Sequence, residues 1–222
     1  MRFDQTKWDS LGQIAPVLDY PSGVGLFRQG APALDVYCIR EGMVKLVFLS
    51  PDGGELIVAL CSYGKVLGAF SAILHETYPV SAETTTPCQL VRVPADAFLR
   101  FVKEDGFMSW QLHEMHSRML SDLVQQVAQL GCVRARDRLE NIPWSMLSGL
   151  DLLDTKKPIR LQPPLKYYEI AKLIAVTPQY LSSLLGELER EGLVCRNKGS
   201  FLIADPNRLW HLGDRPNDPT YY

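Results

Sequence analysis

The sequence lacks the features that mark secreted, membrane-spanning and metal-bound proteins. No apolar stretch reaches the roughly 18 residues of a membrane-spanning helix. The first ten residues, MRFDQTKWDS, are charged and polar where a signal peptide needs an apolar run. The five cysteines are scattered without a CxxC pair, which argues against a disulfide framework, an iron–sulfur cluster and a zinc ribbon. We therefore expect a reduced, cytoplasmic protein without membrane contact.

An overall surplus of positive charge is also missing. Lysine and arginine total 23 against 25 aspartates and glutamates, so the formal net charge is −2. Hydrophobic residues make up 46% of the 222 residues, which is ordinary for a globular protein. The length allows one large domain or two small ones, each with its own hydrophobic core.

The region from about Val24 to Val93 reads as short β-strands separated by turns. The runs at 36–39, 43–49, 55–60 and 90–93 are rich in β-branched and apolar residues. Pro51-Asp52-Gly53-Gly54 joins two of them and is typical of a hairpin turn. Short strands at regular spacing predict a small barrel or sandwich.

A helical period replaces this pattern near Phe107. One stripe along the predicted helix consists of Leu112, His116, Met119, Leu123, Gln126 and Leu130. A second stripe runs through Leu120, Val124 and Val127. We expect one stripe to pack on the β-domain and the other on a second copy of the helix, and we assign the first to dimerisation. The alternative is a single buried helix in a monomer.

Two short helices joined by a tight turn are predicted between Tyr167 and Val194. Thr177 suits an N-cap, and Pro178 suits the first helical position. An apolar stripe follows at i, i+3, i+4 and i+7, formed by Leu181, Leu184, Leu185 and Leu188. Gly192 occupies the place of a left-handed C-cap, and a short hairpin comes after it. This is the pattern of a helix-turn-helix followed by a wing.

The outer side of the second predicted helix carries small hydrogen-bonding residues, which suit contact with base edges in a major groove. Charge supports this modestly, because residues 133–204 hold eleven lysines and arginines against eight acids, a balance of +3. Three cations that flank the helix are candidates for phosphate contact. The predicted DNA-binding residues are Lys166, Thr177, Pro178, Gln179, Tyr180, Ser182, Ser183, Arg196 and Lys198. The alternative is an ordinary helical hairpin in an enzyme core.

The order of β-domain, long helix and winged helix-turn-helix resembles the Crp/Fnr family of bacterial transcription regulators. The residues that carry the resemblance are 37–44, Gly53, 64–68, 169–171 and 181–194. The resemblance implies an α+β fold with a cyclic-nucleotide-binding-like β-roll sensor at 1–104, a dimerisation helix at 105–131, a winged helix-turn-helix at 132–204 and a polar tail at 205–222. It also implies a homodimer on a palindromic site in double-stranded DNA. We expect contact with RNA polymerase and no catalytic activity.

The candidate effector pocket departs from the family's cyclic-AMP receptors. Those proteins hold the ribose with a Gly-Glu-Leu segment and the cyclic phosphate with an Arg-Ser pair. This chain has Gly68-Ala69-Phe70 and Val80-Ser81 at those places, so the carboxylate and the guanidinium are missing. A buried phosphate without a positive partner is poorly compensated. We therefore expect that cyclic AMP does not bind tightly.

The recognition helix also departs from the family's frequent Arg-Glu-x-x-x-Arg pattern. Pro178, Gln179 and Ser183 occupy those positions, so the arginine that commonly pairs with guanine is absent. Gln179 could pair with adenine, and Ser182 or Ser183 with a base of either strand. We expect a target that differs from the common family half-sites, with DNA shape contributing more to specificity.

Several sensor chemistries and rival functions stay open. No cysteine precedes Cys38, which argues against an N-terminal iron–sulfur cluster. Haem ligation by His75, His113 or His116 is one alternative, but a solvated loop histidine at His75 and a seam-facing polar residue at His116 are favoured. A redox switch at Cys195 is another, but a buried, inert thiol is the commoner case. No cofactor or metal is expected, and the effector is an apolar small molecule, a redox signal or none.

Two functions from other classes compete with a DNA-binding regulator. The first is a small-molecule-sensing signalling module that acts through protein partners. The second is a cupin-like enzyme, which needs several histidines on strands, whereas His75 is the only histidine in the β-domain.

Overall fold

The computed structural model describes residues 15–140, 142, 159–161, 165–197 and 200–204. The chain forms two compact units, residues 1–124 and residues 125–222. Outside the described residues lie the predicted tail at 205–222, Lys198 and several other residues of the predicted winged helix-turn-helix at 132–204.

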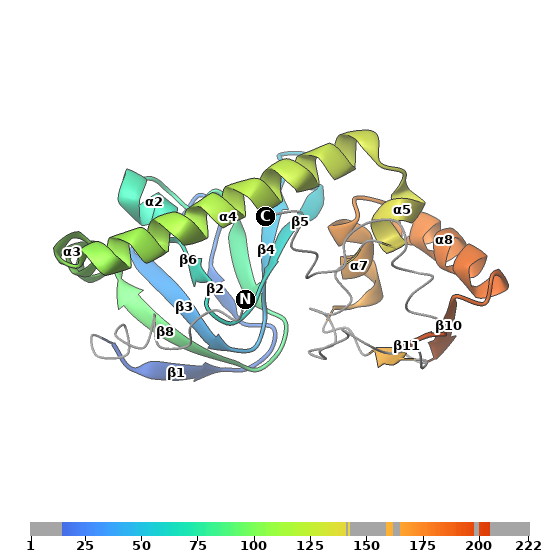
Figure 1. Ribbon diagram of the computed structural model, residues 1–222, viewed down its shortest axis with the longest axis horizontal. Coiled ribbons are helices and arrows are strands. Elements are labelled where there is room, and N and C mark those ends of the chain that lie inside the picture. Colours follow the sequence, from blue (N-terminus) through green and yellow to red (C-terminus); the bar gives the residue numbers. More distant parts are fainter. Residues whose placement is uncertain (1–14, 141, 143–158, 162–164, 198–199, 205–222) are drawn as a thin grey trace. The chain divides into compact units, whose positions relative to one another are not determined.

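The first unit is a β-roll of two four-stranded sheets (Figure 1). One sheet has the order β1-β8-β3-β6, with strands Val17–Tyr20, Cys88–Pro94, Asp35–Glu41 and Val66–Leu67. The other has the order β2-β7-β4-β5, with strands Gly25–Phe27, Ser81–Thr84, Val44–Leu49 and Glu55–Cys61. All neighbouring strands are antiparallel. The predicted hairpin across Gly53 is confirmed, whereas β1 begins earlier than the sequence pattern indicated.

Strands β3 and β8 are buried on both faces. Side chains alternate along a strand, so Tyr37 and Ile39 enter the core between the sheets, while Val36 and Cys38 face the other way. On β8, Leu90 faces the same core as Ile39, and Val91 and Val93 face the second core with Val36. A strand covered on both sides needs a continuous apolar run, which explains the uninterrupted Val36-Tyr37-Cys38-Ile39 segment.

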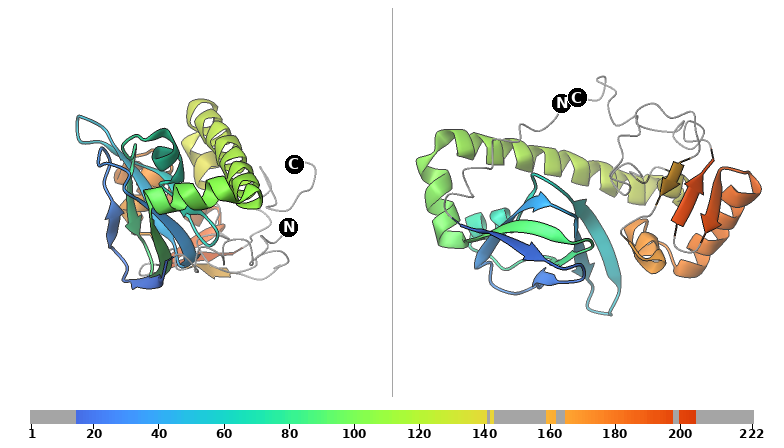
Figure 2. Two further views of the ribbon diagram at one scale, coloured as in Figure 1. Left: turned by 90° about the vertical axis from the view of Figure 1, so that its left-hand side faces the viewer. Right: turned by 90° about the horizontal axis from the view of Figure 1, so that it is seen from below.

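Three helices cover the outer face of the β1-β8-β3-β6 sheet. They are α2 (Ala69–Leu74), α3 (Ala95–Glu104) and the long α4 (Gly106–Cys132), which passes along the roll (Figures 1 and 2). Phe98 of α3 and Met108, Leu112 and Met115 of α4 fill the second core. The sequence analysis predicted α4 but neither α2 nor α3. It also ended the long helix at Gly131, whereas the helix includes that glycine.

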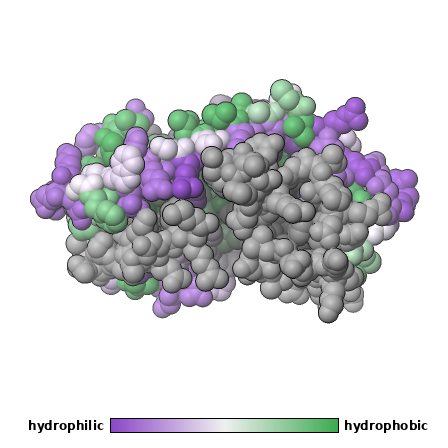
Figure 3. Space-filling view, viewed as in Figure 1, coloured by the Kyte–Doolittle hydropathy of each residue, from purple (hydrophilic) through white to green (hydrophobic). Residues whose placement is uncertain are grey.

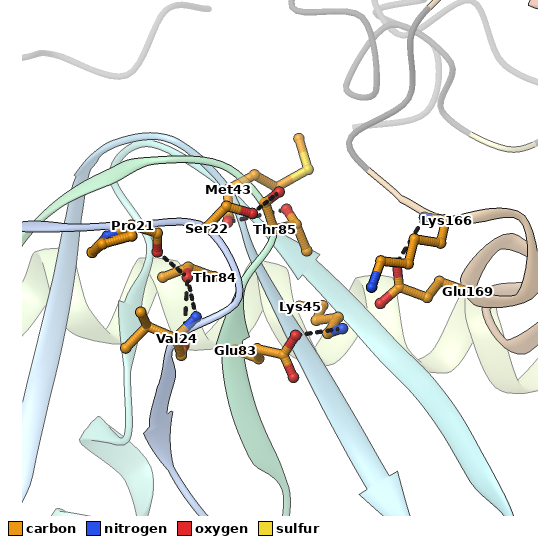
Figure 4. Close-up of polar contacts among 10 residues, drawn as sticks. All are labelled: Pro21, Ser22, Val24, Met43, Lys45, Glu83, Thr84, Thr85, Lys166 and Glu169. Atoms are coloured by element: carbon orange, nitrogen blue, oxygen red, sulfur yellow. Dashed lines mark hydrogen bonds and ion pairs between the residues drawn. The ribbon is translucent and has the colours of Figure 1, made fainter. Parts of the chain in front are cut away.

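Polar contacts fasten the turns of the roll where its strands exchange sheets (Figure 4). The buried Thr84 hydroxyl donates to the Pro21 carbonyl at 2.7 Å and accepts the Val24 N–H at 2.9 Å. Lys45 of β4 pairs with Glu83 of β7 at 2.9 Å, directly across the strand pair. These bonds satisfy buried polar groups and hold the segment before β2 against β7.

The second unit contains α5 (Ala135–Glu140), α7 (Tyr167–Leu173) and α8 (Pro178–Arg190). Its sheet has the order β10-β11-β9, with strands Val194–Asn197, Ser200–Ile203 and Ile159–Leu161. The predicted hairpin is confirmed as β10 and β11, which pair antiparallel. The third strand, β9, was not predicted.

Gly42 and Gly53 give a matched test of the turns that set the register of the roll. Both have φ 87, but a Cβ on Gly42 would lie 2.3 Å from the Pro87 carbonyl oxygen, whereas one on Gly53 would meet nothing within 4 Å. Gly53→Ala should cost about 1–2 kcal/mol, the penalty of a left-handed L-residue. Gly42→Ala should lower the free energy of unfolding by at least about 2 kcal/mol more, because the Pro87 backbone cannot move aside to admit the new methyl group.

Urea unfolding followed by circular dichroism measures both variants. Equal losses of stability in the two alanine variants would contradict the close approach of Gly42 to Pro87.

Candidate nucleic-acid interface

A short turn joins α7 to α8, and local hydrogen bonds cap the start of each helix. The Glu169 carboxylate accepts the backbone N–H of Lys166 at 2.7 Å and caps α7 (Figure 4). After α7, Ala175 takes a left-handed conformation with φ 52. The Thr177 hydroxyl then accepts the Tyr180 N–H at 3.2 Å, with Pro178 at the first helical position. The predicted N-cap is therefore confirmed.

Burial on one side of α8 leaves its other side exposed. Leu181, Leu184, Leu185 and Leu188 are at most 2% exposed, and full burial of a leucine side chain contributes about 1.5–3 kcal/mol. The residues predicted to face outward on the first two turns are all exposed: Gln179, Tyr180, Ser182 and Ser183. Thr177, Pro178 and Lys166 are exposed as well. The structure thus brings the predicted residues from Thr177 to Ser183 together at the start of α8, whereas Lys166 lies at the start of α7.

A glycine turn ends α8 and starts the wing. Gly192 has φ 70, its N–H donates to the Glu189 carbonyl at 3.0 Å, and the Leu193 N–H donates to the Leu188 carbonyl at 2.9 Å. These two bonds form a Schellman motif, so the predicted C-cap is confirmed. The chain reverses there, and β10 returns beside α8.

Arg196 of β10 lies against the exposed side of α8. Its Nη2 donates to Glu189 Oε2 at 2.6 Å, and its backbone N–H donates to Glu189 Oε1 at 2.9 Å. Its Nη1 lies 3.5 Å from the Ser182 hydroxyl. Hydrogen bonds from Arg196 lower the pKa of Glu189, and the same contact raises the pKa of Arg196. Sequence analysis named Arg196 without this carboxylate partner.

The arginines of α5 have structural partners. Arg136 donates Nε to the buried Glu140 at 2.8 Å and both terminal nitrogens to Glu191 at 2.6 Å. Arg138 donates to the Ile174 carbonyl at 3.0 Å and to the Val133 carbonyl at 2.7 Å. The two side chains therefore tie α5 to the C-terminal ends of α7 and α8. Sequence analysis had counted them only as positive charge.

In the first unit, three of the five candidate effector residues line a small apolar cavity. Gly68, Phe70 and Val80 line it together with Phe27, Tyr78 and Met119, and its volume is about 20 Å³. That is room for about one water molecule, whereas ligand pockets span roughly 300–1,000 Å³. Phe27 and Tyr78 stack with ring centroids 4.0 Å apart. Ala69 is fully buried in the neighbouring core, and the Ser81 hydroxyl accepts the Gln29 N–H.

The exposed surface of α4 differs from the predicted dimerisation stripe. Leu112 is 4% exposed in the second core of the roll, and Met119 packs against that core. Leu112 is therefore a core residue, which corrects the sequence assignment. His116, Gln126 and Leu130 are half-buried. The exposed large apolar residues in the C-terminal half of the helix are Leu120, Leu123, Val124 and Val127, at 49–63%. Figure 3 shows hydrophobic residues gathered along the upper edge of the view, where Figure 1 draws α4.

The histidines and the cysteine considered as sensors do not form a cluster. Burial lowers the pKa of His116, and the charge of His113 acts in the same direction. His75 ends α2 on the surface. Cys195 is exposed, contrary to the expected buried thiol. Within the described residues, no group of three or more histidine, cysteine, aspartate or glutamate side chains could hold a metal ion.

Over the same part of the chain, no helix has the length and apolar character that crossing a membrane requires.

Two family models match the two regions. Residues 17–105 match the cyclic nucleotide-binding domain, and residues 146–212 match the Crp-like helix-turn-helix domain. A CRP-like cAMP-activated global transcriptional regulator of Mycobacterium tuberculosis is 26% identical over 199 residues, covering 89% of this chain and 87% of that protein. The nitrogen fixation regulation protein FixK of Bradyrhizobium diazoefficiens is 27% identical over 192 residues, covering 86% of this chain and 78% of FixK.

Solved structures agree in fold. The c-di-GMP responsive global regulator CLP of Xanthomonas campestris superposes with a TM-score of 0.79 at 17% identity, covering 90% of this chain and 99% of that chain. FixK2 of Bradyrhizobium japonicum gives a TM-score of 0.75 at 19% identity, covering 90% of this chain and 98% of that chain.

Proposed function

Because this chain belongs to the Crp/Fnr family of transcription regulators, we propose that it works as a homodimer on a palindromic DNA site, with one α8 helix in each half-site. The exposed polar side of α8 is the observation that supports this most directly. Gln179, Ser182 and Ser183 are hydrogen-bonding residues of modest size, so the helix can approach base edges in a major groove. Lys166 is an exposed cation at the start of α7 and suits a phosphate contact.

Dimerisation through α4 is the second part of the proposal. Leu120, Leu123, Val124 and Val127 recur at helical spacing and are 49–63% exposed. An exposed apolar stripe along a helix is stabilised by a partner helix of the same kind. Dimers with this DNA-binding motif bind half-sites about one DNA turn apart, roughly 34 Å, and we expect the same spacing here. A palindromic target follows from the two-fold symmetry of the dimer. We also expect the protein to act in the cytoplasm and to contact RNA polymerase at the promoter.

The proposal excludes cyclic AMP as the effector. The cavity at Gly68, Phe70 and Val80 is about 20 Å³ and apolar, and stacked Phe27 and Tyr78 contribute to its lining. A cyclic nucleotide would have to displace these side chains and leave its phosphate without a cation. The mycobacterial relative is described as cAMP-activated, so the two proteins would differ in their signal. An apolar small molecule, a redox signal and no effector are the alternatives.

Sequence-specific DNA binding is tested by fluorescence anisotropy on a duplex selected from a random pool. Affinity should fall steeply as salt rises, because phosphate contacts release counterions. Gln179→Ala should weaken binding to the selected duplex by roughly 5- to 150-fold, the value of one bidentate base contact, with little change on unrelated DNA.

The matched control is Gln89→Ala, an exposed glutamine of the β-roll, which should bind as the parent does. Weak, salt-insensitive binding to every duplex would reject the function and favour a module that acts through protein partners.

The dimer interface is tested with Val124→Asp, which places a charge in the middle of the exposed stripe. Light scattering should show a monomer, and affinity for the palindrome should fall by at least about ten-fold, because two linked half-sites bind more tightly than one. Leu34→Asp is the control, since Leu34 is 71% exposed and lies just before β3, outside α4. A dimeric Val124→Asp variant would contradict this interface.

Exclusion of cyclic AMP is tested by titration calorimetry. We expect no measurable heat with cyclic AMP up to millimolar concentration and no change in DNA affinity, because the cavity cannot hold the ligand. Binding in the micromolar range or tighter would reject this part of the proposal.

A further inference from the structure

The exposed side of α8 lacks a cation of its own over its first two turns. Residues 178–185 include neither lysine nor arginine. Arg190 comes only in the last turn, where its Nε donates to the Gly186 carbonyl at 3.3 Å. Arg196 reaches the same side of α8 from β10, with its guanidinium between Glu189 and Ser182. The wing therefore supplies a guanidinium to a surface whose helix has none in those turns.

Glu189 holds Arg196 at two points. One carboxylate oxygen accepts the Arg196 backbone N–H at 2.9 Å, and the other accepts Nη2 at 2.6 Å. Both the strand and the end of the side chain are thereby oriented relative to α8. Ordering a long side chain before binding reduces the entropy lost when it contacts a ligand. A guanidinium has five N–H donors, and after its contacts with Glu189, Ser182 and Tyr167 two are left for another acceptor.

The charge of the pair favours a base over a phosphate as that acceptor. The contact with Arg196 lowers the pKa of Glu189, which keeps the carboxylate ionised at neutral pH. An ionised Glu189 offsets the positive charge of Arg196, so the pair attracts phosphate weakly. The charge of Glu189 does not remove the remaining N–H donors of Arg196. A guanine edge needs two such donors, for O6 and N7, and it does not need net positive charge.

We propose that Arg196 reads a guanine in the major groove from the wing side of α8, and that Glu189 is the residue that positions it. This inference rests on the proposed DNA-binding function and adds a base contact that the recognition helix itself does not contain. It also assigns Arg196 a different ligand from the phosphate contact expected from sequence. Ser182, 3.5 Å from Nη1, lies beside the site.

The test compares Arg196→Lys and Glu189→Gln with the parent chain by fluorescence anisotropy. The probes are the selected duplex, the same duplex with each guanine replaced in turn, and an unrelated duplex. Arg196→Lys should lose roughly 5- to 150-fold on the selected duplex, because lysine keeps the charge but not the two-donor geometry. The penalty for replacing one particular guanine should disappear in this variant, while binding to unrelated DNA stays unchanged.

Glu189→Gln should behave differently, because it frees one positive charge. Affinity for unrelated DNA should rise, and the slope of log affinity against log salt should steepen by about one. Discrimination at the same guanine should fall, because the guanidinium is no longer held in place. Arg190→Lys is the matched control on α8 and should leave discrimination unchanged.

Three results would overturn the inference. Arg196→Lys with intact discrimination at every guanine would make Arg196 a phosphate contact. Equal losses on all duplexes in both variants, accompanied by lower melting temperatures, would make the pair a brace for the wing. If the parent chain bound no duplex in a salt-dependent manner, the proposed function itself would be rejected. The measurement on unrelated DNA separates this outcome from the first two, in which the parent chain still binds DNA.

Discussion

Burial of four leucines on one side of α8 determines which of its residues can meet a partner. Leu181, Leu184, Leu185 and Leu188 are at most 2% exposed, so rotating the helix about its axis would expose apolar surface and bury hydroxyl and amide groups. Both changes are costly. The Thr177 cap at one end and the Schellman turn at Gly192 at the other define the helix between them. The polar surface is thus a consequence of the core behind it.

Arginine and glutamate pairs then connect this helix to its surroundings. Arg136 joins α5 to Glu191 at the C-terminal end of α8, and Arg196 joins the wing to Glu189 two residues earlier. Glu140 is buried, and an unpaired buried carboxylate is strongly unfavourable, so Arg136 is needed where it lies. Arg136, Arg138 and Arg196 therefore have specific partners, so the balance of +3 over residues 133–204 says little about how many cations face outward.

Packing of the β-roll leaves only a small apolar cavity at Gly68, Phe70 and Val80. Its two cores are packed from both faces of β3 and β8, and Phe70 and Val80 line what is left of the pocket. Close packing of an interior means that a ligand can enter only if side chains move.

Sequence alone determined the features that are encoded within a few neighbouring residues. The hairpin at Gly53, the cap at Thr177, the leucine stripe and the turn at Gly192 each depend on local periodicity or on one residue's backbone preference, and all are present in the structure. Tertiary structure decided which residues of α4 pack on the roll: Leu112 and Met119 of the first stripe do, whereas Leu123 of the same stripe stays exposed, because the neighbouring sheet covers only part of the helix. It also brought Glu189 to Arg196 and Arg136 to Glu191, since these pairs form where the chain reverses or returns, and no periodic pattern in the sequence records such meetings.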